Sequence, residues 1–174
     1  MPCSYMSICA QALCRAFNMS IAICPGSFDP VTLGHMDIIA RSSRLFDKVY
    51  VVALVNPGKA YMFPKDTRLE MLRLACAGLD NVVVEDCDGL LADYATSKNA
   101  SAIVKGLRGF SDFQYEQTMA NANKYLAPGV ETMFLNCDPA LAHVSSTFAR
   151  VLIQQKRPVD GVVPSRVMDI IEKT

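Results

Sequence analysis

The sequence contains no tryptophan and only two histidines among its 174 residues, and it has no excess of either charge. Lys and Arg together number 17, and Asp and Glu together also number 17, so the formal net charge at pH 7 is zero. This balance argues against a large polybasic surface for nucleic acid or a membrane, although it is compatible with a local basic site. No apolar run is long enough to cross a bilayer. We therefore expect neither nucleic acid nor a membrane as a partner.

The sequence also lacks any Cys-x-x-Cys pair, although it contains seven cysteines. An odd number of cysteines without paired spacing disfavours both a disulfide framework and a metal site. We expect reduced thiols that pack as small hydrophobic side chains, and therefore a cytoplasmic protein. The apolar content of 51% is enough to form a core without a disulfide or a metal.

The first 18 residues, MPCSYMSICAQALCRAFN, differ in character from the rest of the chain. They lack the basic start of a secretory signal, and Leu13 is too bulky for lipoprotein cleavage before Cys14. Met19 then begins a clear strand pattern. No linker, repeat or low-complexity segment interrupts the chain after Met19. We predict that residues 1–18 are a dispensable extension and that residues 19–174 form one domain.

From Ser20 onward, short apolar runs alternate with amphipathic stretches. The runs predict strands at 20–24, 49–55, 82–85, 101–104 and 131–135. The stretches predict helices at 34–46, from about 66, and at 90–98, 111–126, 145–156 and 164–173. Helices between buried strands imply right-handed crossovers and a parallel sheet covered on both faces. The predicted fold class is α/β, a single doubly wound domain with about five parallel strands. We expect ligands at the loops after the first, fourth and fifth strands.

The loop after the first predicted strand reads PGSFDPVTLGH and leads into a helix. Gly34 allows close backbone approach at the helix start, where free N–H groups and the helix dipole favour phosphate. Ser27 supplies a hydroxyl group. His35 is expected on the first helical turn, where its imidazole can donate to a phosphoryl oxygen whose charge grows in a transition state. A glycine-rich turn with a surface histidine is the alternative, and the flanking SFDP string disfavours it.

Two further loops carry groups that bind phosphate. KGLRG after the fourth strand contains Lys105 and Arg108, although basic residues at strand ends are often merely solvated. VSSTFAR follows the fifth strand, and Ser145 or Ser146 can cap the helix that begins there. The sequence has no Walker GxxxxGK[ST] motif and no GxGxxG motif after a strand. A kinase and a dinucleotide-dependent oxidoreductase are therefore disfavoured.

Taken together, TLGH at 32–35 and SSTFAR at 145–150 resemble the two signature motifs of the nucleotidyltransferase superfamily, which shares its fold with class I aminoacyl-tRNA synthetases. The longer strings PGSFDPVTLGHMDII, NPGK with MF at 56–63, VKGLRGFSDFQYE and VSSTFAR are similar to the phosphopantetheine adenylyltransferase family. The resemblance extends from Met19 to the C-terminus. It implies a Rossmann-like nucleotidyltransferase fold and the penultimate step of coenzyme A synthesis, in which ATP and 4′-phosphopantetheine give dephospho-coenzyme A and pyrophosphate with Mg²⁺.

The same resemblance implies direct in-line attack by the acceptor phosphate, catalysed mainly by positioning and charge stabilisation. It also implies a homohexamer and inhibition by coenzyme A. The alternatives are an adenylyltransferase for another phosphorylated acceptor, such as nicotinate mononucleotide, or a non-catalytic nucleotide-binding regulator. The KGLRGFSDFQYE string disfavours the first alternative, and the intact His35 together with the Ser-Ser-Thr loop disfavours the second.

By motif position, the resemblance makes His35 the catalytic residue that stabilises the transition state. It places ATP at Ser27, Phe28, His35, Gly106, Leu107, Arg108, Glu116, Leu141, Ala142, His143, Val144, Ser145, Ser146 and Thr147. It places the acceptor at Ser27, Lys59, Leu91 and Lys105, and it assigns no residue to a metal. Asp138-Pro139-Ala140-Leu141 departs from the aromatic-containing loop of the family. Tyr94, Tyr115 and Tyr125 are expected to be half-buried helix residues.

Overall fold

The computed structural model describes residues 19–56 and 58–173, which are built around a five-stranded sheet in the order β3-β2-β1-β4-β5. All four strand pairings are parallel. The strands are β1 (Ile21–Gly26), β2 (Lys48–Leu54), β3 (Val82–Cys87), β4 (Ala102–Leu107) and β5 (Glu131–Asn136). This confirms the predicted α/β fold. The predicted extension at 1–18 lies outside the described residues.

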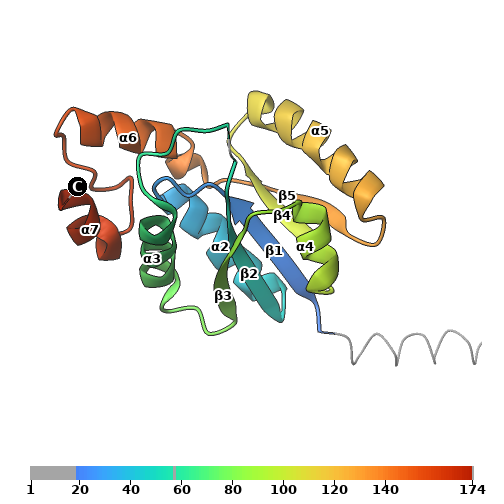
Figure 1. The fold of residues 1–174 in the computed structure, drawn as a ribbon. Coiled ribbons are helices and arrows are strands. Elements are labelled where there is room, and N and C mark those ends of the chain that lie inside the picture. The colour runs from blue at the N-terminus through green and yellow to red at the C-terminus, as the bar shows by residue number, and fades with distance from the viewer. Residues whose placement is uncertain (1–18, 57, 174) are drawn as a thin grey trace, which may run out of the picture.

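The strand order reverses between β1 and β4, so the loops after these two strands diverge at the carboxyl edge of the sheet. Helices α2 (Leu33–Leu45), α3 (Lys65–Cys76), α6 (Ser146–Gln154) and α7 (Met168–Glu172) cover one face, and α4 (Leu91–Ser97) and α5 (Phe110–Leu126) cover the other (Figure 1). Two short 3₁₀ turns, η1 (Pro139–Leu141) and η2 (Ser165–Val167), complete the described elements. No described helix is long and apolar enough to span a membrane.

Alternate residues of the central strands build two separate cores. Ala22, Val49 and Val51 face α2 and α3, whereas Ile23 and Val52 face α4. All five side chains are fully buried. Such strands are buried on both faces, which explains why they appear in the sequence as continuous apolar runs.

Several details of the prediction were wrong. The first and third strands extend beyond their predicted ends, to Gly26 and Cys87. The fourth strand does not end at residue 104, because Lys105 and Gly106 continue the ladder opposite Phe134 and Leu135 of β5. The helix predicted at 164–173 is divided into η2 and α7. The 3₁₀ turn η1 was not predicted at all.

Helix α5 packs only lightly on the sheet, and Asn123 is its only buried residue. Tyr115 and Tyr125 are 68% and 86% exposed, so the expectation that they are half-buried was wrong. Tyr94, in α4, is partly buried as expected. The four described cysteines are free, with Cys24 and Cys76 buried in the core. Burial raises the pKa of both buried thiols to about 11, which disfavours the reactive thiolate form.

Candidate active site

His35 lies in the first turn of α2, where a capping box fixes its ring. Thr32 is the N-cap residue, and its Oγ accepts the His35 N–H at 3.4 Å. In return, the backbone N–H of Thr32 donates to His35 Nδ1 at 3.0 Å. Because Nδ1 acts as an acceptor, the ring proton is assigned to Nε2, which makes Nε2 a hydrogen-bond donor.

The surroundings of the ring keep His35 neutral. Desolvation by burial, assisted by the positive charge of Arg108, lowers the pKa of His35 from 6.5 to about 4. Phe28 forms an edge-to-face contact with the ring, with the centroids 4.9 Å apart. A neutral imidazole with a fixed Nε2–H is suited to stabilise an oxygen on which negative charge develops.

The loop after β1 is held in a tight conformation. Phe28 is buried and has a φ of 47°, a left-handed conformation that is uncommon for a non-glycine residue. A Cβ atom at Gly26 would lie 2.9 Å from Phe28 Cζ, so glycine is required where the ring folds back. The buried carboxylate of Asp29 accepts the N–H groups of Met62 and Phe63 at 3.0 and 2.9 Å, which fastens this loop to the segment before α3.

The Ser-Ser-Thr segment at the start of α6 leans on the same loop. Ser145 is the N-cap residue and accepts the Phe148 N–H at 3.0 Å. Ser146 Oγ donates to the Pro30 carbonyl at 2.8 Å. Arg150 Nη1 donates to the Asp29 carbonyl at 2.7 Å. These hydroxyl and guanidinium groups therefore have structural partners, and the first N–H groups of α6 are what the segment offers to phosphate.

Two pairs of predicted residues lie together. Lys59 Nζ donates to Ser27 Oγ at 3.3 Å, which joins the loops after β2 and β1. Lys105 Nζ lies 3.0 Å from Glu116 Oε2, and both side chains are mostly buried. The resemblance assigns Lys105 to the acceptor and Glu116 to ATP, so the ion pair links the two predicted subsites. Leu91 begins α4 on the opposite face of the sheet and packs against the second core.

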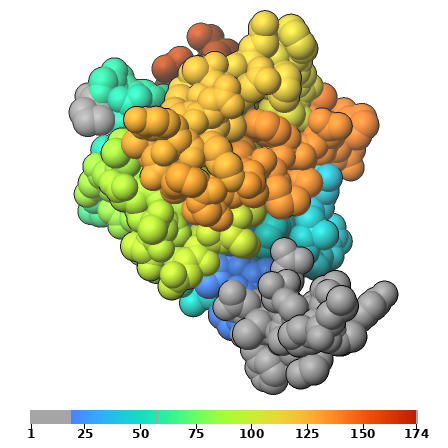
Figure 2. Space-filling model, turned by 90° about the vertical axis from the view of Figure 1, so that its right-hand side faces the viewer, coloured from blue at the N-terminus to red at the C-terminus, as the bar shows by residue number. Residues whose placement is uncertain are grey.

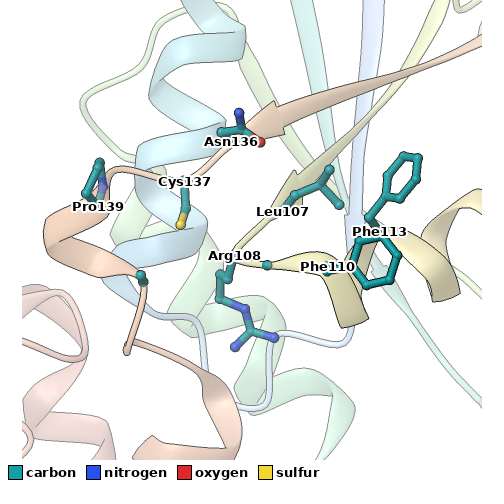
Figure 3. Close-up of a pocket in the computed structure, with 9 residues that line it drawn as sticks. Leu107, Arg108, Phe110, Phe113, Asn136, Cys137 and Pro139 are labelled. Carbon is teal, nitrogen blue, oxygen red and sulfur yellow. The ribbon is translucent and has the colours of Figure 1, made fainter.

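A cavity of about 590 Å³ opens where β4 and β5 end. Figure 3 shows Pro139 and Cys137 on one side of it and Phe110 and Phe113 on the other. Arg108 at its edge is fixed by a double contact with Asp112, with Nε–Oδ2 at 2.9 Å and Nη2–Oδ1 at 3.1 Å. Its lining residues are Leu107, Arg108, Gly109, Phe110, Phe113, Asn136, Cys137, Pro139 and Ala142.

Aromatic and apolar walls with few polar groups suit a planar nucleotide base. Among the predicted ATP residues, Leu107, Arg108 and Ala142 line this cavity. Gly106 lies one residue inside β4, where a Cβ atom would approach Ile38 Cγ1 of α2 to 2.7 Å. Leu141 ends η1, His143 is exposed, and Val144 and Thr147 lie between η1 and the first turn of α6.

Sequence reasoning missed several contributors. Phe110, Phe113 and Asn136 line the cavity but belong to no phosphate-binding pattern. Thr32 and Asp29 belong to the predicted motif without a predicted role of their own, although each fixes a loop through backbone N–H groups. The capping pattern at Thr32 could have been identified from the sequence because threonine is a favoured N-cap residue. Arg68 of α3 carried no signal, yet its Nη1 donates to the Ser27 carbonyl at 2.5 Å.

The parallel sheet, the neutral histidine at a helix start and the cation-bearing loops define a nucleotidyltransferase type of α/β protein. Residues 23–151 match the model of the cytidylyltransferase-like family. A solved structure from Vibrio parahaemolyticus, assigned as a nicotinate-nucleotide adenylyltransferase, matches with a TM-score of 0.69 at 19% identity. That match covers 90% of this chain and 93% of the other chain, and it bears on the fold alone.

Closer relatives narrow the assignment. The chain is 50% identical over 143 residues to the phosphopantetheine adenylyltransferase of Symbiobacterium thermophilum, covering 82% of this chain and 88% of that protein. It is 46% identical over 155 residues to the phosphopantetheine adenylyltransferase of Bifidobacterium longum, covering 88% and 93%. The chain therefore belongs to the phosphopantetheine adenylyltransferase family, as the motifs predicted.

Proposed function

We propose that this chain transfers the adenylyl group of ATP to 4′-phosphopantetheine, giving dephospho-coenzyme A and pyrophosphate in the penultimate step of coenzyme A synthesis. The observation that carries the proposal is the capping box of Thr32 and His35, which orients a neutral imidazole with Nε2–H free to donate. The membership of the chain in this family supports the same reaction. A group of this kind serves a reaction in which charge builds on phosphoryl oxygens.

In this reaction the acceptor phosphate attacks the α-phosphorus in line, and pyrophosphate leaves. Lys59 and Ser27 hold the acceptor phosphate from one side, and Lys105 holds it from β4. The adenine base occupies the cavity beside Phe113, while the N-terminus of α6 receives the polyphosphate. His35 Nε2–H donates to the transferring phosphoryl group as its charge grows. The acceptor phosphate is already an anion, so no strong general base is required.

ATP would carry Mg²⁺, which would supply positive charge to neutralise part of the triphosphate. Across residues 19–56 and 58–173, no three His, Cys, Asp or Glu side chains cluster so as to hold a metal ion. Mg²⁺ that accompanies a nucleotide usually keeps several waters and is held by the phosphates together with one or two carboxylates.

The test of the function is pyrophosphate release from ATP, measured with phosphopantetheine, with nicotinate mononucleotide and with buffer alone. We expect release that depends on phosphopantetheine. Release only with nicotinate mononucleotide would assign the chain to a sister activity. No release with either acceptor, despite ATP binding, would favour a nucleotide-binding regulator.

The proposal includes a homohexamer that acts in the cytoplasm and is inhibited by coenzyme A. The support for assembly is the outer surface of α5, which is visible in yellow and gold in Figure 2. Monomers rarely leave so many large apolar side chains of one helix in water. They are Phe110, Tyr115, Met119, Tyr125 and Leu126, with exposures of 73%, 68%, 41%, 86% and 49%.

Light scattering measures the assembly directly. We expect the double variant Tyr115→Glu with Met119→Glu to give smaller particles than the unmodified chain. Leu45→Glu, at an exposed position on α2, is the matched control. Coenzyme A should compete with phosphopantetheine because both carry the pantetheine arm. Inhibition that more phosphopantetheine does not relieve would place coenzyme A elsewhere.

A further inference from the structure

Arg68 is a buried cation that has no acidic partner among the described residues. Only 1% of its surface is exposed, which makes it the largest fully buried side chain of the described residues. None of the ion pairs formed within residues 19–56 and 58–173 includes Arg68. Its Nε is buried and has no hydrogen-bond partner there. A guanidinium group stays charged when buried, so leaving it without an ion-pair partner costs folding stability. Such a cost suggests a functional reason for the residue.

Four contacts link this guanidinium, Tyr61, Lys59 and Ser27 in a closed ring. Arg68 Nη1 donates to the Ser27 carbonyl at 2.5 Å, and the guanidinium carbon lies 4.1 Å from the centroid of the Tyr61 ring. Lys59 Nζ lies 5.6 Å from the same ring centroid. Lys59 Nζ also reaches Ser27 Oγ at 3.3 Å, which closes the ring. Two cations therefore converge on two atoms of Ser27 and share one aromatic side chain.

Tyr61 also fixes the loop that carries Lys59. Its hydroxyl accepts the Asn56 N–H at 2.7 Å and donates to the Leu54 carbonyl at 3.5 Å, where β2 ends. The ring of contacts thus connects the loop after β1, the loop after β2 and helix α3. Lys59 is a long, exposed side chain that would otherwise lose much rotamer freedom on binding an anion.

We propose that Arg68 and Tyr61 form a positioning pair for the acceptor phosphate. Arg68 holds the Ser27 backbone and the Tyr61 ring, and Tyr61 holds the ammonium group of Lys59 beside Ser27 Oγ. The buried charge of Arg68 adds positive potential beneath the same spot, and a nearby dianion is the group that this potential favours. The inference rests on the proposed function, because Ser27 and Lys59 are the acceptor-binding residues of that function.

Calorimetric titration of phosphopantetheine and of ATP, each measured alone, separates this role from general stabilisation. We expect Arg68→Gln to weaken phosphopantetheine binding by about tenfold or more, which corresponds to about 1.4 kcal/mol, and to change ATP binding by less than about threefold. Arg68→Lys should recover part of the affinity because it keeps the charge and loses the planar stacking. Arg73→Gln, an exposed arginine on the same helix, is the matched control and should bind both ligands normally.

Tyr61 variants test the pair without removing a buried charge. Tyr61→Leu should bind phosphopantetheine several-fold more weakly. Tyr61→Phe keeps the ring but loses the hydroxyl contacts with Asn56 and Leu54, so its affinity should lie between that of Tyr61→Leu and that of the unmodified chain. Folded Arg68→Gln that binds both ligands like the unmodified chain would overturn the inference. If Arg68→Gln does not fold, unchanged phosphopantetheine affinity in Tyr61→Leu overturns it equally. An unmodified chain that binds no phosphopantetheine would instead refute the proposed function.

Discussion

Replacing His35 with alanine should slow the chemical step far more than it weakens ATP binding. The ring is fixed by the Thr32 N–H at 3.0 Å and by the edge of Phe28 at 4.9 Å between centroids, so the Nε2–H donor is already oriented before the reaction. Loss of one such preorganised donor typically costs about 2.7–4 kcal/mol, or roughly 10²–10³ in kcat. The dissociation constant of ATP should change by less than about threefold, because the charge that His35 stabilises is absent from the ground state.

His35→Gln provides the matched control, since an amide N–H is also a neutral donor. We expect its kcat to lie between those of the unmodified chain and His35→Ala. The comparison also tests the protonation state. The pKa of His35 is lowered to about 4 by burial, so the imidazole stays neutral throughout the assay range.

The assay is therefore the ratio of kcat for the unmodified chain to kcat for His35→Gln, measured from pH 5 to pH 8. Titration of the acceptor phosphate, whose second pKa is about 6 in phosphorylated side chains, affects both proteins and cancels in this ratio. We expect a flat ratio. A ratio that bends near pH 6.5 would mean that His35 works in its protonated form, and near-normal turnover in His35→Ala would remove it from the mechanism.

Four more variants or conditions test other parts of the chain. Because the pKa of His35 is lowered from 6.5 to about 4 in the folded chain, the unfolded chain binds a proton more readily between these pH values, and the free energy of unfolding should fall as the pH drops from 6.5 to 4. Urea unfolding should show this decrease, which should not exceed about 3 kcal/mol, and His35→Gln should lack it. Lys105→Ala should raise the KM of phosphopantetheine more than that of ATP, and Lys105→Arg should retain much of the function; an unchanged acceptor KM would assign the acceptor to Lys59 instead. Gly106→Ala should lower the free energy of unfolding by about 1–3 kcal/mol because its Cβ would lie 2.7 Å from Ile38 Cγ1, whereas Gly89→Ala has no heavy atom within 4 Å of its Cβ and should be nearly neutral. Removing residues 1–18 should leave turnover and Tm nearly unchanged, and an aggregating or inactive product would contradict this expectation.

The fold was predictable because both faces of the sheet are buried. Strands such as β2 then appear as continuous β-branched runs, and the helices between them show a different period. The prediction of the end of β4 was wrong because the backbone pairing of this strand continues beyond its apolar residues. Lys105 and Gly106 are too polar or too small to mark a strand, but their backbone pairs with β5. The division between η2 and α7 left no mark in the apolar pattern, because Val167 and Ile171 both pack in the core and are four positions apart, as they would be in one continuous helix.

The candidate site was predictable as a set of loops but not as a set of contacts. Motif strings placed His35 and the Ser-Ser-Thr segment correctly beyond the carboxyl edge of the sheet, whereas Lys105 lies inside β4 and not in the loop after it. They could not reveal that Ser146 donates to Pro30, 116 positions earlier, or that Arg150 holds Asp29, 121 positions earlier. These hydrogen bonds form because the folded chain brings the loop after β1 next to α6. No local pattern of residues indicates which distant residues become neighbours.

The chain has zero formal net charge although its candidate site contains several cations, because most of these cations are paired with carboxylates. Lys105, Arg108 and Arg150 are each matched by a nearby carboxylate, from Glu116, Asp112 and Asp29 respectively. These pairs add nothing to the overall charge, so composition alone could not reveal a phosphate site. Lys59 and Arg68 differ, because neither forms an ion pair in the described part of the chain and both contact Ser27. Among the described residues, two cations that form no ion pair thus meet at Ser27, and their positive potential favours an anion there.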